Sequence, residues 1–268
     1  GGARRGPTRD ARSEPRSCDG VRPGLAGPEA KARSPLAWLR YVTALAALIP
    51  AQANAGAWIA PEGGQEIITS VAGERNGVRV FESAAYWEVP LGERTSVVAA
   101  PWVEQNYDTY DGWRGEATLS VKRVALRRGD TVVAVQAGAL WASHPDEGCG
   151  EGGGEARILA GRNIGSHAFA NAEVAGRALS GGCGGARLDL TVGYRPRENW
   201  LAMAQTFVDA SREGEEAIRA QITMVRFSAN GRGVQLGVRA RLDGDDAEPA
   251  LVFALWGRPG SDREAGRN

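Results

Sequence analysis

Histidine and cysteine are the residue types from which this chain would build a nucleophilic or metal site, and it has few of them. Its 268 residues include two histidines and three cysteines. His167 follows Ser166, but a Ser–His hydrolase also needs a third polar group to orient the histidine. No Asn-rich motif surrounds His144 or His167. We therefore predict no catalytic residue, no cofactor and no metal site, with a barrel lipid hydrolase as the enzymatic alternative.

Two of the cysteines lie in similar glycine-rich surroundings. Cys149 and Cys183 are each flanked by a glycine on both sides, in connectors that separate predicted strands. Both connectors are expected on the extracellular side, where the environment is oxidising and disulfides form. We predict a Cys149–Cys183 disulfide, with two free thiols as the alternative. Cys18 lies in the leader and would be removed with it.

Charged side chains recur on one face of the alternating runs. The predicted lumen charges are Glu82, Glu88, Lys122, Glu155, Arg157, Glu173, Arg177, Arg187, Asp189, Arg195, Arg219, Arg239 and Arg241. A polar conduit whose arginines attract anionic solutes is one interpretation. Paired charges that fill a narrow barrel are the other, since about eight strands enclose a filled interior and about sixteen an aqueous channel.

Apolar and polar residues alternate with a period of two in twelve runs, which indicates strands. The runs are residues 64–74, 78–90, 95–106, 114–127, 130–143, 154–163, 166–179, 186–196, 199–210, 215–228, 232–242 and 248–257. Soluble strands average about 5–6 residues, whereas transmembrane barrel strands need about 9–11. The length of the runs therefore favours an all-β, transmembrane, antiparallel up-and-down barrel of about 12 strands, with 10–14 possible.

The connectors support the same architecture. Those after even-numbered runs are short, and several after odd-numbered runs are longer and rich in Gly, Asp and Glu. Short turns at one end and longer loops at the other are typical of outer-membrane barrels. A soluble periplasmic β-sandwich is the alternative. In a barrel, the tryptophans near strand ends would form interface girdles. These predicted interface aromatics are Trp87, Trp102, Trp113, Trp141, Trp200 and Trp256.

The leader is the only segment with the features of a targeting sequence. Arg33 and Arg40 precede a short apolar run, and an Ala-x-Ala site follows it; these features describe a signal peptide at residues 36–55 that is cleaved after Ala55. Residues 1–35 are rich in Arg, Pro and Gly, and we expect them to be disordered, with a native start downstream of them as one interpretation. We expect residues 56–257 to form the barrel and residues 258–268 to form a disordered tail.

The formal net charge of zero is a sum over unlike parts. Residues 1–55 hold nine basic and four acidic side chains, which leaves 23 basic and 28 acidic ones in residues 56–268. The exported body is therefore mildly acidic, and we expect no nucleic-acid partner.

Five short motifs of the body lie at residues 56–61, 86–88, 92–94, 159–162 and 169–173. They resemble motifs of small Gram-negative outer-membrane barrels, particularly the transporter-like group named after the meta-pathway of phenol degradation. The resemblance implies a bacterial outer-membrane location after signal-peptide cleavage, with contact to membrane lipid. It also implies a terminal aromatic residue recognised by the barrel-insertion machinery. Here, Phe253 and Trp256 are instead followed by a polar tail.

Together, these features predict porin- or transporter-like passage of an unidentified small solute through a charged lumen. A plugged barrel with a structural or surface-binding role is the alternative.

Overall fold

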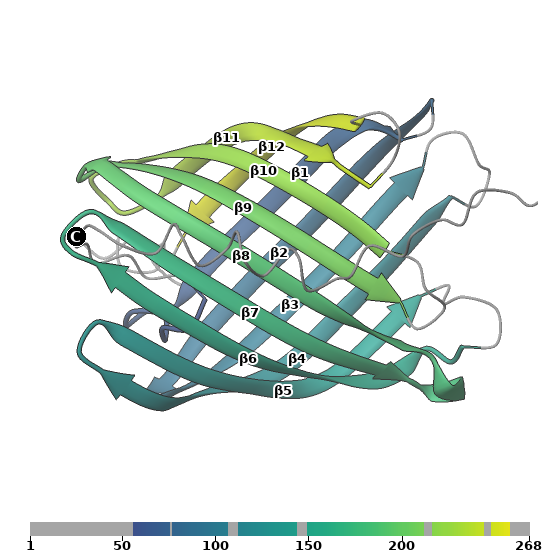
Figure 1. The fold of residues 1–268 in the computed structure, drawn as a ribbon, viewed down its shortest axis with the longest axis horizontal. Helices are drawn as coiled ribbons and strands as arrows, with labels where there is room; N and C mark the ends of the chain where they lie inside the picture. The colour runs from purple at the N-terminus through teal and green to yellow at the C-terminus, as the bar shows by residue number, and fades with distance from the viewer. Residues whose placement is uncertain are drawn as a thin grey trace, which may run out of the picture. The chain divides into compact units, whose positions relative to one another are not determined.

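The computed structural model describes residues 56–75, 77–106, 112–143, 149–211, 216–243 and 248–257. In these residues, twelve antiparallel strands form a closed barrel (Figure 1). The strands are β1 (Gln65–Arg75), β2 (Val78–Gly92), β3 (Thr95–Asn106), β4 (Trp113–Arg128), β5 (Thr131–Ser143), β6 (Gly152–Ile164), β7 (Ala168–Leu179), β8 (Gly184–Arg197), β9 (Trp200–Ser211), β10 (Glu216–Phe227), β11 (Gly233–Arg241) and β12 (Glu248–Gly257). This architecture confirms the predicted barrel and excludes the β-sandwich.

Each strand pairs with its neighbours in sequence, and β1 pairs with β12 to close the wall. The closing register places Val71 opposite Val252. The ladder shifts at three places, in β2 near Pro90, in β4 near Val124 and in β8 near Tyr194. All three shifts lie toward the same end of the barrel.

Connectors of two lengths distinguish the two ends of the barrel. Those after even-numbered strands span two to five residues, and we call their end the turn end. Gly129 and Gly165 take positive φ angles of 56° and 68° there, which glycine adopts without steric cost. At the opposite, loop end the connector after β1 spans two residues and the others span four to eight. Segment 56–64 enters β1 at the turn end, where β12 also finishes.

Large apolar side chains cover the outside of the wall. Leu119, Ile158, Ile222 and Leu251 are all more than 60% exposed. Their neighbours along each strand point inward and include polar residues such as Gln136, which donates to Ser120 Oγ at 2.8 Å. A soluble protein would bury the apolar face instead. In the described part of the chain, no helix has the length and apolarity to span a membrane.

An apolar core fills the turn end of the barrel from inside. Ala57 and Trp58, which precede β1, pack there with Leu159, Phe169 and Leu201, among others. Trp58 lies directly over Gly161 of β6, where a Cβ atom would come within 2.3 Å of its ring. The segment before β1 is therefore part of the barrel interior, which the sequence patterns did not predict.

Four of the six predicted interface tryptophans lie on the outer face. Trp113 and Trp141 lie near the loop end. Trp87 and Trp200 lie toward the turn end, where Trp87 Nε1 donates to Glu66 at 2.8 Å and Arg226 stacks on Trp200.

The prediction was wrong for Trp102 and Trp256, because side-chain direction follows the parity of the strand and not closeness to its end. Trp102 shares its parity with Glu104 and lines the lumen. Trp256 shares its parity with Ala254, packs edge-on against Phe227 and donates to Gln235 at 2.6 Å. The predicted leader (1–55) and tail (258–268) lie outside the described residues.

Candidate functional site: a charged lumen closed at the turn end

The structure places every predicted lumen charge on the inner face of the wall. Eight of them line one cavity, namely Glu82, Glu155, Arg157, Arg177, Arg187, Arg219, Arg239 and Arg241. Glu173 and Asp189 lie beside Arg157, and Arg195 stacks on the inward-facing Phe227 ring. Glu88 and Lys122 lie deeper, almost without exposure. The period-two pattern thus predicted that these charges point inward, but it did not predict which of them pair.

Two ion pairs join strands that are separated in the wall by two other strands. Glu116 of β4 forms an ion pair with Arg177 of β7 at 2.5 Å, although β5 and β6 lie between these strands. Glu82 of β2 forms an ion pair with Arg239 of β11 at 3.0 Å, although β1 and β12 lie between these strands. Both pairs therefore cross part of the lumen and narrow it.

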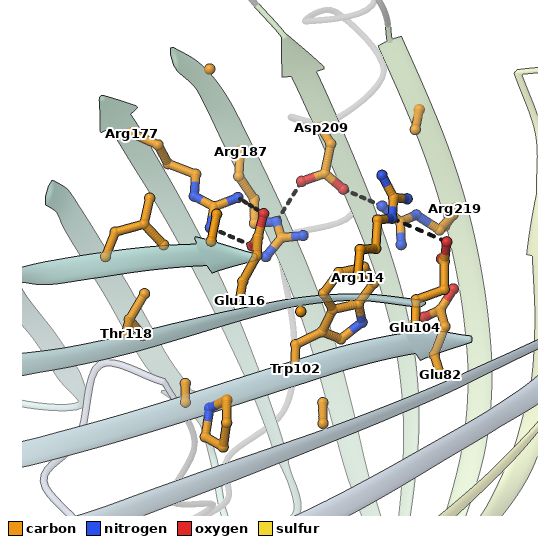
Figure 2. Close-up of a pocket in the computed structure, with 18 of the residues that line it drawn as sticks. Glu82, Trp102, Glu104, Arg114, Glu116, Thr118, Arg177, Arg187, Asp209 and Arg219 are labelled. Atoms are coloured by element: carbon orange, nitrogen blue, oxygen red, sulfur yellow. Dashed lines mark hydrogen bonds and ion pairs between the residues drawn. The ribbon is translucent and has the colours of Figure 1, made fainter. Parts of the chain in front are cut away.

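The remaining lumen charges form chains of ion pairs along the wall. Asp209 of β9 accepts from Arg187 of β8 at 2.5 Å and from Arg219 of β10 (Figure 2). Glu155 accepts a hydrogen bond from Arg157 at 2.6 Å and forms an ion pair with Arg177 at 3.1 Å. Arg157, Arg177, Arg187 and Arg219 are thus each held by at least one carboxylate, which fixes the direction of the guanidinium.

Six charged residues of the cavity lining were missed by the sequence analysis, namely Glu74, Glu104, Arg114, Glu116, Asp209 and Glu248. Glu116 and Arg114 have the same parity as Lys122 in one run, so parity alone would have placed them inside. At the loop-end mouth, Arg114 lies 5.4 Å from the Trp102 ring centroid and 3.1 Å from Glu104.

These residues surround a cavity of about 520 Å³ in the loop-end half of the barrel. Its lining includes seven acidic and seven basic residues among those described. The lining therefore has no net charge of its own, so the predicted attraction for anions finds no support in it. Cys149 and Cys183 lie at its mouth, joined by a disulfide with a Cα–Cα distance of 5.7 Å.

Between the cavity and the turn end, one buried lysine binds the segment that precedes β1. We call this segment, residues 56–60, the inner segment. Lys122 Nζ donates to the carbonyl oxygens of Gly56 at 3.0 Å and Trp58 at 2.8 Å. It also forms a 2.7 Å ion pair with Glu88. A fully buried ammonium is stable only with such partners, so the position of Lys122 depends on the inner segment.

The carboxylate of Glu88 and the amide of Asn171 complete this attachment. Glu88 accepts from the Ala60 backbone N–H at 3.0 Å and from Ser96 Oγ at 2.7 Å. Asn171 Oδ1 accepts from Ala57 N at 3.2 Å. The inner segment is therefore held from β2, β4 and β7, and it blocks the turn end.

The one histidine that the structure describes lies away from the charged cavity. His167 Nδ1 lies 2.9 Å from Ser166 Oγ in an exposed turn, outside the lumen network. No group of three His, Cys, Asp or Glu residues within the described ranges is placed to hold a metal ion. His144 lies outside the described residues.

At the loop end, Asp243 binds the neighbouring arginine. Arg241 Nε donates to Asp243 Oδ1 at 2.9 Å, Arg241 Nη2 donates to Oδ2 at 2.6 Å, and Ile218 N donates to Oδ1 at 3.1 Å. These donors lower the pKa of Asp243 from 3.8 to about 2.

No protein-family model matches the sequence. No curated protein matches it either. Among solved structures, the chain is similar to an outer membrane channel from Pseudomonas putida F1. The TM-score is 0.53 at 9% identity, over 76% of this chain and 99% of that one.

The chain is also similar to a KdgM porin in complex with disordered oligogalacturonate. The TM-score is 0.52 at 6% identity, over 71% of this chain and 97% of that one. Identities this low demonstrate the fold alone. The chain has the fold of outer-membrane porin-like barrels.

Proposed function

We propose that the mature chain is an outer-membrane barrel that admits small polar solutes from its loop end and passes them on when the inner segment is displaced. The observation that carries this proposal is the charged cavity of about 520 Å³, whose lining extends to Cys149 and Cys183 at the loop end. A lumen that served only as packing would be filled throughout with side chains.

The outer face of the barrel supports a membrane location. Apolar side chains cover it, and lipid accepts a strand wall only when every backbone group is paired, as closure by β1 and β12 ensures. Export by the signal peptide at residues 36–55, cleavage after Ala55 and assembly by the barrel-insertion machinery belong to the same proposal. So does membership of the meta-pathway group, which the motif at residues 56–61 supports.

A second candidate function is a plugged barrel without transport. The hydrogen bonds that Lys122, Glu88 and Asn171 form with the inner segment favour this plugged barrel, because these contacts must break before the turn end opens. The two functions therefore differ in whether the inner segment leaves its site.

Ion conductance in planar bilayers distinguishes them. The double variant Lys122→Met/Glu88→Gln removes the anchoring charges together, so that neither is left buried and unpaired. We expect infrequent openings for the wild type and a larger, more persistent current for this variant. The matched control is Arg226→Gln, a change on the outer face that should conduct as the wild type does. Folded barrels that carry no current in either form would overturn the proposal and favour the plug.

A further inference from the structure

The acidic and basic residues of the cavity are unevenly distributed around the wall. Strands β1 to β4 contribute four acidic residues (Glu74, Glu82, Glu104 and Glu116) and one arginine, whereas β6 to β12 contribute six arginines and three acidic residues. Figure 2 shows Glu116 facing Arg177, with Arg187 next to them. A solute in this cavity thus lies between one stretch of wall with an excess of acidic residues and another with an excess of arginines.

The pairs that cross the lumen also stand in the path of a solute. Arg177 and Glu116 keep side-chain exposures of 19% and 33% to the cavity, and Arg239 and Glu82 keep 15% and 10%. All four side chains are therefore accessible to a ligand in the cavity. They are nevertheless too enclosed for water to solvate their charges fully once a pair is separated. A solute that separates such a pair must replace the interactions of both members.

The charge of the solute decides whether that replacement is complete. An anion would bind Arg177 but leave Glu116 facing another negative charge, and a cation would do the reverse. A molecule with both an ammonium and a carboxylate satisfies both members at once. The equal number of acidic and basic residues in the lining agrees with a neutral, dipolar ligand.

We propose that the cavity binds zwitterionic solutes such as amino acids, with the ammonium against Glu116 and the carboxylate against Arg177 and Arg187. The pair formed by Glu82 and Arg239 offers a second position with the same polarity. This inference rests on the proposed function for its place in a solute path, but binding itself needs no passage through the turn end.

Saturation-transfer NMR on the barrel in nanodiscs tests it with γ-aminobutyrate as the probe. Butyrate and butylammonium are comparison ligands of the same chain length that carry one charge each. We expect saturable binding of γ-aminobutyrate and binding at least about tenfold weaker for both comparison ligands, since each leaves one charge unpaired. Equal binding of butyrate would overturn the proposal in favour of an anion site.

Variants locate the site. Glu116→Gln/Arg177→Gln should weaken γ-aminobutyrate binding by about tenfold or more, whereas the outer-face changes Glu66→Gln and Arg226→Gln should leave it unchanged. If the double variant does not fold, the single change Glu116→Gln takes its place. Unchanged binding in a folded variant at Glu116, or no binding to the wild type, would overturn the inference. Ion conductance tests the proposed function separately, because a barrel can bind γ-aminobutyrate without conducting ions and can conduct ions without binding γ-aminobutyrate.

Discussion

At the scale of single residues, Lys122 has the most demanding position in the barrel. It is fully buried, and its ammonium is satisfied by one carboxylate and by backbone oxygens of the inner segment. Breaking a buried ion pair on one side only is costly, because the other charge remains without compensation.

Lys122→Met should therefore destabilise the folded barrel by about 3–5 kcal/mol. The measurement is urea-induced unfolding in lipid vesicles, followed by tryptophan fluorescence. Adding Glu88→Gln should restore part of the loss, because no unpaired carboxylate is then buried. Equal unfolding midpoints for the single and double variants would contradict this explanation.

Asp243 gives a pH-dependent prediction outside the strands. Its pKa of about 2 lies below the ordinary 3.8, with hydrogen bonding from Arg241 as the main cause. The stabilisation from this contact is complete above the unfolded pKa and disappears as the pH falls through about 2. In Arg241→Gln, the titration of the Asp243 carboxyl carbon, followed by NMR, should move upward toward 3.8. A titration that stays near 2 would assign the low pKa to the Ile218 N–H instead.

At the scale of elements, the inner segment packs against the wall at a glycine, Gly161 of β6, which has no side chain. Trp58 occupies the space that a Cβ atom on Gly161 would need. The strand and the segment thus fit together only because residue 161 is glycine.

Gly161→Ala should push Trp58 away and loosen residues 56–60, at an overpacking cost of about 1–3 kcal/mol. Faster amide hydrogen exchange in these residues is the expected measurement. Gly176→Ala, in neighbouring β7, is the matched control, because a Cβ atom there meets open space. Exchange that is the same in both variants would contradict the packing argument.

The disulfide joins two connectors that are far apart in sequence. Cys149 follows β5 and Cys183 precedes β8. Proteolysis without reductant should give the two cysteine-containing peptides as one linked species, and reductant should separate them. Cys149→Ser/Cys183→Ser should still form the barrel, because the backbone ladders are independent of this link. Separate peptides in the unreduced digest would contradict the pairing.

At the scale of the whole molecule, the strands of the wall were predictable from the sequence, whereas the inner segment and the ion pairs that cross the lumen were not. A period of two in runs such as 232–242 fixes strands, and parity fixes the inward direction of Arg239 and Arg241. The inner segment has no such period, because its position depends on Lys122, Glu88 and Asn171, which are distant in sequence. The crossing pair of Glu116 and Arg177 depends likewise on barrel closure, which no local pattern contains.

The barrel as a whole should require an amphiphile. Because its apolar face points outward, residues 56–257 should stay in solution only with detergent or lipid. The unheated protein should migrate differently from the boiled protein on an SDS gel. A mature chain that remains fully soluble and monomeric without detergent would contradict a membrane barrel.

The pairing of β1 with β12 also has a consequence for how the chain folds. Every other ladder joins strands that follow each other, so its formation encloses only a short loop. The final ladder encloses nearly the whole barrel and carries its largest loop-closure entropy, which makes it the natural slow step. A circularly permuted chain, opened at the turn after β4 and with its old ends linked, would shift this step to the β4–β5 ladder while keeping the same wall.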